Sequence, residues 1–535
     1  MASTYDRSAI SLETASAIPK RIIICCDGTW QSATSLDPTK GCESNVTRLC
    51  RALAKTGTDR KEPEKVWQQV VFYDAGVGTG DISGFEQKRQ GGLGIGLIEN
   101  VIESYNFIVS NYSAGDQLFF FGFSRGAFTV RSAAGLVGQI GVLKPCYMPF
   151  FIKHYNSWIN GKDAKGNSLA WSDRGKPFSA YPPWMEFMTE NPRCAIKTAK
   201  EVPIQVMGVW DTVGSLGVPN LGHIWNYYKS NKEAYQFHDT ELNDQILHAY
   251  QALALDETRA AFSPAIWKLK KTPFPEFGTE KVAAQQARQY LCQCWFPGAH
   301  VNVGGGNSGN ADPNKATGDL EQLASISYAW MLDRIRPHLA LDEDALDVQF
   351  KPFEELAQSA SENTKTGTGW RIWDQAVAMK DYWTGTQKPV LTGYARGHIE
   401  DSNTLMYKIM ASPQDRTPNR YHDQENEYSV ERIHPSVYLR QKSKDVNGDA
   451  IYRPMALKGW VRIYKEDGMG RGGAKRKGWV WVKYKNNNTE KAEIENWLWE
   501  FQISKLPAGK SLEKRLMENS WVKPEQEKIQ EGWSS

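Results

Sequence analysis

Short, uninterrupted apolar runs alternate along this chain with longer stretches in which apolar residues recur at helical spacing. A continuous apolar run is typical of a strand that is buried on both faces of a parallel sheet. Such runs lie at 21–26, 66–73, 117–121, 202–210 and 292–296, and helical spacing marks 92–112 and 127–137. Because strands that alternate with helices form parallel sheets with right-handed crossovers, we expect an α/β fold whose mostly parallel sheet is flanked by helices.

Residues 20–335 carry this alternation, and we interpret them as one domain with an insertion. The insertion, at 146–200, is rich in aromatic residues, glycine and proline, and we expect it to lie over the sheet like a lid. Such aromatics suit an acyl-chain pocket, and ordinary core packing is the alternative. Residues 336–439 mix helical and loop patterns, so we expect an accessory region that packs on the domain.

The last part of the chain, 440–535, has a different pattern. Residues 440–487 contain 13 lysines and arginines against 4 acidic residues, and two alternating segments flank a glycine-rich turn there. This predicts a basic β-hairpin followed by a charged C-terminal helix. The apolar stripe of that helix would consist of Ile494, Trp497, Leu498 and Phe501. A basic, tryptophan-containing hairpin suits peripheral contact with an anionic membrane, and a solvated hairpin face is the alternative.

Composition narrows the class of protein. Of 535 residues, 41% are hydrophobic and 23% are charged, as in ordinary globular proteins. The 64 lysines and arginines nearly balance the 61 acidic residues, which argues against a nucleic-acid-binding protein. The 8 cysteines form no CxxC pair, and we expect no metal and no cofactor. Residues 1–21 lack the apolar segment of a signal peptide, and no apolar run reaches the roughly 20 residues of a membrane span, so we expect a cytoplasmic location.

The strongest chemical signal is Gly122-Phe123-Ser124-Arg125-Gly126, a G-x-S-x-G motif. It follows an apolar strand and precedes a helical stretch, which is the placement of a nucleophile elbow. In such an elbow Gly122 and Gly126 flank a strained turn, where a side chain would crowd the neighbouring strand or helix. The turn presents the Ser124 hydroxyl as a nucleophile and the Arg125 backbone N–H as an oxyanion donor. An ordinary Gly-Ser turn is the alternative.

A nucleophilic serine needs a base, and the base needs an orienting acid. His300 lies on a glycine-rich loop just after an apolar strand, where its ring can reach over a serine. Asp211 ends another apolar strand between the two, which fits the chain order serine, acid, histidine. Asp256 is the competing acid, but it lies in a stretch with helical spacing. We therefore predict a triad of Ser124, Asp211 and His300.

The turn after the first strand, Asp27-Gly28-Thr29, lies at the carboxyl end of that strand. The backbone N–H of Gly28 or Thr29 could supply a second oxyanion donor, and a plain turn capped by Asp27 is the alternative. A phosphatase with Asp27 as nucleophile is the weaker interpretation, because the usual second acid two residues later is replaced by Thr29.

Five segments occur in order along the chain, at 26–29, 121–136, 209–215, 252–257 and 295–300. Together they resemble the α/β-hydrolase catalytic domain shared by type VI secretion phospholipase effectors and many uncharacterised fungal proteins. The resemblance covers about 20–335, and 416–418 and 433–437 resemble the downstream region of the fungal members. Family members often carry serine and aspartate after the motif histidine, where this chain has Val301 and Asn302.

This resemblance implies ester hydrolysis of the lipase or phospholipase A type, with Ser124 as nucleophile, Asp211 as acid and His300 as base. We therefore predict a serine hydrolase that cleaves lipid or other small-molecule esters through an acyl-enzyme. The alternative is a non-catalytic interaction protein on a hydrolase scaffold, for which a degraded triad would be the signature. We expect no bacterial effector role, because no secretion or delivery segment is evident.

Overall fold

A computed structural model provides the structure of the chain. The residues that it describes are 18–28, 43–58, 63–76, 95–163, 166–169, 176–198, 201–213, 242–270, 289–306, 322–350, 394–395, 397, 399, 413–420, 427–443, 452–469, 475–485, 494–503 and 510–518. Its main strands are β1 (Lys20–Cys26), β2 (Thr56–Thr58), β3 (Val66–Asp74), β4 (Gln117–Phe123), β7 (Ile204–Trp210), β8 (Ile246–Ala254), β10 (Tyr290–Phe296), β12 (Glu431–Ile433), β13 (Trp460–Met469), β14 (Lys475–Tyr484) and β15 (Ile494–Trp499). Two-stranded ribbons are formed by β5 (Val142–Leu143) with β6 (Ala195–Lys197) and by β9 (Leu269–Lys270) with β11 (Glu427–Tyr428). Its helices are α1 (Asn45–Ala52), α3 (Ile95–Asn111), α4 (Ser124–Ile140), α5 (Met148–Ile159), α6 (Pro182–Glu190), α9 (His300–Gly304), α10 (Gln322–Ile335), α14 (Pro435–Lys442) and α15 (Leu512–Glu518).

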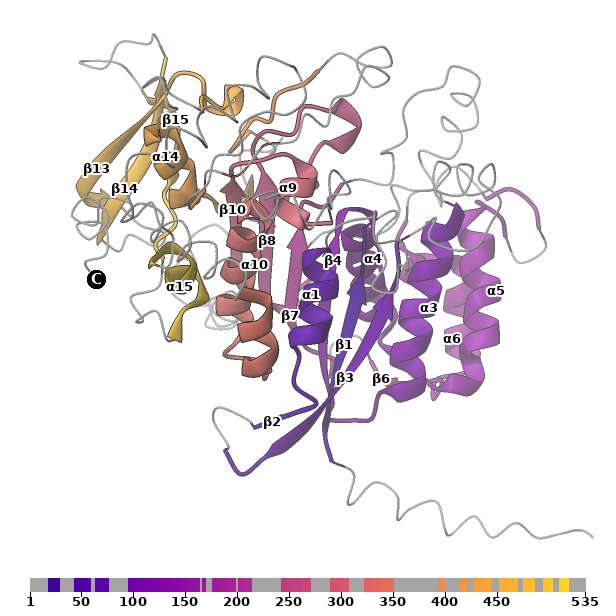
Figure 1. Ribbon diagram of the computed structural model, residues 1–535. Helices are drawn as coiled ribbons and strands as arrows, with labels where there is room; N and C mark the ends of the chain where they lie inside the picture. Colours follow the sequence, from indigo (N-terminus) through magenta and orange to yellow (C-terminus); the bar gives the residue numbers. More distant parts are fainter. Residues whose placement is uncertain are drawn as a thin grey trace, which may run out of the picture.

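An eight-stranded sheet in the order β12-β10-β8-β7-β4-β1-β3-β2 forms the centre of the molecule. The strands pair in parallel except for the short edge strand β2, which runs antiparallel to β3. Their carboxyl ends therefore meet at one edge of the sheet, the upper edge in Figure 1. Residues that directly follow these strands are brought together at this edge, although they lie far apart in the sequence.

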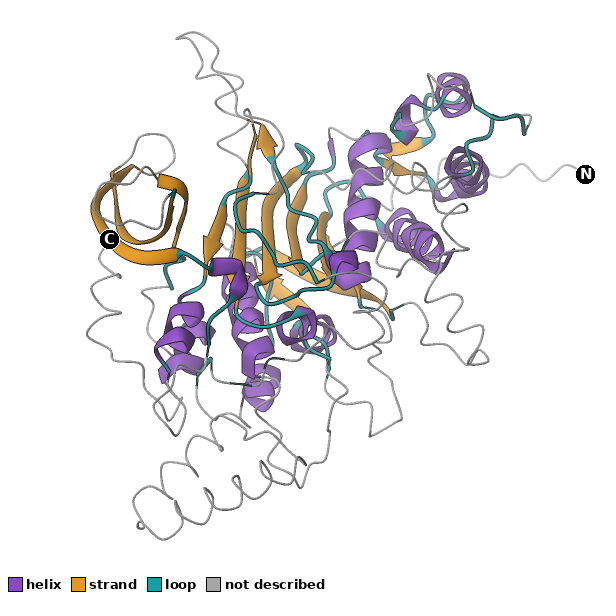
Figure 2. Ribbon diagram, turned by 90° about the horizontal axis from the view of Figure 1, so that it is seen from above, coloured by secondary structure: helices purple, strands orange, loops and turns teal. Residues whose placement is uncertain are grey.

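Helices cover both faces of the sheet (Figure 2). Because successive side chains of a strand point to opposite faces, Ile22 and Ile24 of β1 pack with α3 and α4. Ile23 and Cys25 pack on the other face with α1 and α10. All four side chains are fully buried, which explains the uninterrupted apolar run in the sequence. The predicted mixed α/β fold is confirmed, and the five predicted strands and two predicted helices correspond to β1, β3, β4, β7, β10, α3 and α4.

The strand β8 differs from the sequence prediction. His248, Ala252 and Leu255 follow one another at helical spacing, yet the segment pairs with β7 on one side and β10 on the other. A central strand is apolar on both faces, so the positions of its apolar residues show no clear period. The predicted helix around Asp256 is therefore wrong, and the acid follows the end of a strand.

The aromatic insertion lies beside α3, at the flank of the sheet (Figure 1). Phe151 and Tyr155 of α5 and Trp184 of α6 belong to the same apolar core as α3 and α4. The ring centroid of Phe151 lies 5.1 Å from that of Tyr155 and 6.2 Å from that of Trp184. These buried rings favour core packing, the alternative to a lid, as the reason for the aromatic content.

The chain beyond residue 335 completes the central sheet. We expected 336–439 to pack on the domain as helix and loop, but β12 from this region pairs in parallel with β10. Two of its three residues, Glu431 and Arg432, are charged, so the sequence gives no strand pattern there. α14 follows β12 directly.

The last described part forms a small antiparallel sheet of β13, β14 and β15. The predicted basic hairpin corresponds to β13 and β14, but the predicted helix through 494–501 is wrong at β15. Pairing of β15 with β14 buries Leu498 and leaves Trp497 47% exposed, so strand pairing overrides the helical spacing of these residues. A helix, α15, follows at Leu512–Glu518.

The tryptophans of the hairpin bear on its expected membrane contact. Trp481 is buried, and its indole N–H donates to Glu500 Oε2 at 3.0 Å. Arg462 stacks on the Trp479 ring and donates to both carboxylate oxygens of Glu500. These side chains are therefore engaged within the small sheet, and membrane contact by the hairpin stays a prediction. Among the described residues, no helix has both the length and the apolar character that crossing a bilayer requires.

Candidate active site

Ser124 lies at the sharp turn where β4 ends and α4 begins. Its φ of 57° falls in the left-handed region, which is strained for a residue with a side chain. A Cβ on Gly122 would come within 2.6 Å of Ala127 Cα, and a Cβ on Gly126 within 2.2 Å of the Cys26 carbonyl oxygen. Only glycine fits at either position, so the turn has the geometry that a nucleophile elbow needs.

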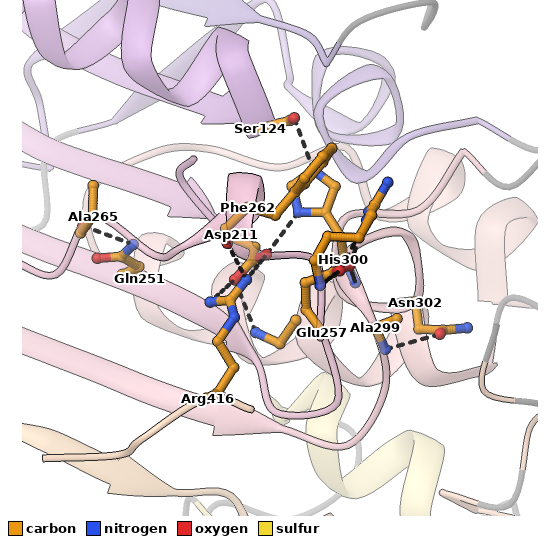
Figure 3. Close-up of polar contacts among 12 residues, drawn as sticks. Ser124, Asp211, Gln251, Glu257, Phe262, Ala265, Ala299, His300, Asn302 and Arg416 are labelled. Atoms are coloured by element: carbon orange, nitrogen blue, oxygen red, sulfur yellow. Dashed lines mark hydrogen bonds and ion pairs between the residues drawn. The ribbon is translucent and has the colours of Figure 1, made fainter. Parts of the chain in front are cut away.

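His300 reaches Ser124 from the start of α9, just after β10 (Figure 3). Its Nε2 atom lies 2.8 Å from Ser124 Oγ, and its Nδ1 atom lies 2.6 Å from Asp211 Oδ2. The imidazole packs against two aromatic rings, with centroid distances of 4.7 Å to Phe123 and 5.0 Å to Phe262. Hydrogen bonds on both nitrogens and packing on the ring fix the orientation of the side chain.

Asp211 directly follows β7 and is fully buried. The Ala254 backbone N–H donates to its Oδ1 atom at 3.0 Å, and the Arg416 guanidinium lies against both carboxylate oxygens. Burial alone raises the pKa of Asp211, but the Arg416 charge and the hydrogen bond from His300 outweigh it and hold the pKa below its usual value. The carboxylate next to His300 is therefore ionised.

Asp256, the competing acid, has a different position. Its Oδ2 atom accepts hydrogen bonds from the Gly298 backbone N–H at 2.6 Å and from the Tyr452 hydroxyl at 2.8 Å. Burial raises the pKa of this carboxyl group. Asp256 thus binds the loop that precedes His300, and Asp211 is the acid that contacts the imidazole.

Glu257 is a neighbour of His300 that sequence reasoning missed. The His300 backbone N–H donates to Glu257 Oε2 at 3.3 Å, and Arg259 pairs with the same carboxylate at 2.8 Å. Burial opposes ionisation of Glu257, but Arg259 lowers its pKa to about 2. Two signals in the sequence concerned Glu257: it lies in 252–257, one of the segments that resemble the family, and it follows an apolar segment that forms β8.

Two of the three predicted oxyanion donors, Arg125 and Gly28, lie among the described residues. Arg125 follows Ser124 in the first turn of α4, where backbone N–H groups point out of the helix N-terminus. Gly28 lies close by, since a Cβ on it would approach Ser124 Cβ to 3.3 Å. However, its N–H donates to Asp27 Oδ1 at 2.8 Å and is thus engaged. Thr29 lies outside the described residues.

The Asp27 carboxylate forms hydrogen bonds within the fold. Its Oδ2 atom accepts hydrogen bonds from Ser44, Thr47 and Tyr73 at 2.5–2.9 Å, and its side chain is buried. These bonds connect the end of β1 to α1, so Asp27 is not placed for the nucleophilic attack of the phosphatase interpretation. In the part of the chain that is described, no three His, Cys, Asp or Glu side chains gather in a way that could hold a metal ion.

Residues 20–334 match the family described as "T6SS, Phospholipase effector Tle1-like, catalytic domain". The match covers more than half of the chain, and the chain therefore belongs to this family.

Two further likenesses concern uncharacterised proteins. An uncharacterised protein of Saccharomyces cerevisiae is 24% identical over 286 residues, which are 50% of this chain and 35% of the yeast protein. The matched part thus spans about a third of that relative's length. The crystal structure of an uncharacterised protein from Pseudomonas aeruginosa aligns with a TM-score of 0.32 and 16% identity, over 61% of this chain and 47% of that one. A likeness at this level carries no argument about the fold or the function.

Proposed function

We propose that this protein is an α/β-hydrolase that cleaves carboxylic esters of lipids, with Ser124, His300 and Asp211 as its catalytic triad. The observation that carries the proposal is the chain of two short contacts from Ser124 Oγ through the His300 imidazole to Asp211. Membership in a family of phospholipase-effector-like catalytic domains supports a lipid acyl ester as the substrate.

Each group has one task in this mechanism. His300 Nε2 takes the proton of Ser124 as its Oγ attacks the acyl carbonyl, and the Arg125 N–H stabilises the oxyanion. Asp211 holds the imidazole in the tautomer with its proton on Nδ1 and stabilises the imidazolium that forms. His300 then returns the proton to the leaving alcohol. Water, deprotonated by the same imidazole, then attacks the acyl-Ser124 ester, and the imidazolium returns that proton to Ser124 Oγ as the fatty acid leaves.

The main alternative is an interaction protein on an inactive hydrolase scaffold. Binding alone requires neither the strained φ of Ser124 nor the alignment of three side chains that follow β4, β7 and β10. The intact geometry therefore favours the enzyme.

The test is covalent labelling with a fluorophosphonate serine probe, followed by a panel of phospholipids and short-chain esters. We expect wild type to be labelled and Ser124→Ala to lose both labelling and ester hydrolysis, because the nucleophile is gone. Ser113→Ala, which removes an exposed hydroxyl outside the site, is the matched control and should behave like wild type. Folded wild type without labelling or hydrolysis, or Ser124→Ala with unchanged activity, would overturn the proposal.

A further inference from the structure

Arg416 enters the site from a distant part of the sequence. It lies 205 residues after Asp211 and beyond the segment that matches the catalytic-domain family. Its side chain is 3% exposed, and its Nη1 and Nη2 atoms donate to the two oxygens of Asp211 at 3.4 and 3.2 Å (Figure 3). Nη2 also donates to the Phe262 carbonyl oxygen at 2.6 Å. The guanidinium therefore holds the carboxylate that holds His300.

The backbone around Arg416 is fixed on both sides. Before it, the Gln414 N–H donates to the Thr258 carbonyl oxygen at 2.8 Å. After it, the Asn419 N–H donates to Glu431 Oε2 at 2.8 Å, and Glu431 belongs to β12 of the central sheet. The segment that contains Arg416 is thus bound to the loop after β8 on one side and to the edge of the sheet on the other. These bonds fix the position of the guanidinium next to Asp211.

We propose that Arg416 is a positioning residue of the hydrolase: it orients the Asp211 carboxylate for His300. This inference rests on the function proposed above. It also implies that the catalytic unit extends past the family match at 20–334, because part of the site is supplied by a later segment.

Loss of Arg416 should affect turnover more than substrate binding. Its two donor atoms restrain rotation of the Asp211 carboxylate, so their loss loosens His300 and lowers kcat. Because the guanidinium is 3% exposed and binds Asp211 and the Phe262 carbonyl oxygen, its loss should leave KM close to the wild-type value.

The test compares kcat and KM of Arg416→Gln with those of wild type. We expect kcat to fall about 10- to 100-fold while KM stays nearly unchanged. Arg416→Lys keeps the charge but lacks the planar fork, so its kcat should fall about tenfold. Arg462→Gln is the matched control, since it breaks a largely buried arginine–carboxylate pair away from the site and should leave the kcat of the folded protein unchanged.

Wild-type kcat in folded Arg416→Gln would overturn the positioning role. If Arg416→Gln does not fold, Arg416→Lys decides, because a folded Lys variant with wild-type kcat would have the same consequence. Failure of the hydrolase proposal itself is distinguishable, because wild type would then escape the fluorophosphonate probe whatever residue stands at 416.

Discussion

Two serine–histidine–carboxylate arrays, each backed by an arginine, lie in the described part of this molecule. The first is Ser124, His300 and Asp211 with Arg416. In the second array, Ser436 Oγ lies 2.7 Å from His434 Nδ1, and His434 Nε2 lies 3.1 Å from Glu513 Oε1. Arg334 pairs with the same glutamate at 3.0 Å.

The two arrays differ in the backbone that carries the serine. Ser124 occupies the strained turn between a strand and a helix, and its hydroxyl contacts Nε2 of a histidine 176 residues away. Ser436 lies in the first turn of α14, where its backbone N–H also donates to the ring of His434, two residues before it. His434 is thus the N-cap of a helix, and the second array is fully buried. A serine, a histidine and a carboxylate in contact therefore do not by themselves make the serine a nucleophile; the strained turn that exposes its hydroxyl is also needed.

The largest difference between the arrays should appear when their acids are neutralised. Asp211→Asn and Glu513→Gln each remove a buried carboxylate charge that pairs with an arginine, so we expect both to lower the free energy of unfolding by about 3–5 kcal/mol. Only Asp211→Asn should lower kcat, by about 10³- to 10⁴-fold, because the amide favours the wrong imidazole tautomer. Denaturant titration and ester hydrolysis by the folded fraction check the two effects.

Each of these variants is the control of the other. Equal losses of kcat in folded protein would mean that the Glu513 array takes part in catalysis. Unchanged kcat in folded Asp211→Asn would remove Asp211 from the proposed triad.

A smaller effect is expected from the glycines, which only the first array has around its serine. Gly126→Ala would place a Cβ 2.2 Å from a backbone oxygen that cannot move away, so we expect a loss of about 3 kcal/mol in the free energy of unfolding. Displacement of the turn should lower kcat about 100-fold.

Gly115→Ala is the matched control for that variant. Gly115 has a positive φ, but a Cβ on it would meet nothing within 4 Å, so it should lose about 1 kcal/mol and no activity. Thermal or chemical denaturation and the rate of fluorophosphonate labelling separate the two. If Gly126→Ala labels as fast as wild type, the elbow does not depend on this close contact.

The fold could be predicted from the sequence for segments whose own pattern of apolar residues determines their secondary structure. β1, β4 and β7 are buried on both faces, and their apolar runs show this directly. β15 was mistaken for a helix because its few apolar residues fit both periods, and pairing with β14 decided between them. β12 is set by its neighbour β10 and not by its own three residues.

The residues of the candidate site also divide into those that a local pattern predicts and those that depend on tertiary contacts. Ser124, Asp211 and His300 each directly follow or closely follow an apolar strand, and a parallel sheet brings such positions to one edge. Arg416 was noticed in the sequence only as part of a segment resembling the fungal members. Its contact with Asp211 depends on a tertiary path through β12 that no local pattern contains. Gly28 was predicted as an oxyanion donor, but the neighbouring Asp27 carboxylate binds its N–H.

The smallest expected effect concerns the charge on the second histidine. Burial lowers the pKa of His434, although Glu513 acts in the opposite direction. As the pH falls below about 6.5, the unfolded chain therefore takes up a proton that folded His434 refuses, and the free energy of unfolding falls. One such group changes the free energy by at most about 1.4 kcal/mol per pH unit.

His434→Asn removes this titration and keeps an oxygen that can accept the Ser436 N–H bond, since asparagine is a favoured N-cap. We expect the stability advantage of wild type over the variant, measured by urea denaturation, to shrink by about 1–2 kcal/mol between pH 7 and pH 5. Stability curves that run parallel over this range would mean that folded His434 accepts the proton. The second array would then hold an imidazolium in its resting state. In the proposed mechanism the first array holds an imidazolium only during turnover, so burial alone would not explain why the two arrays differ.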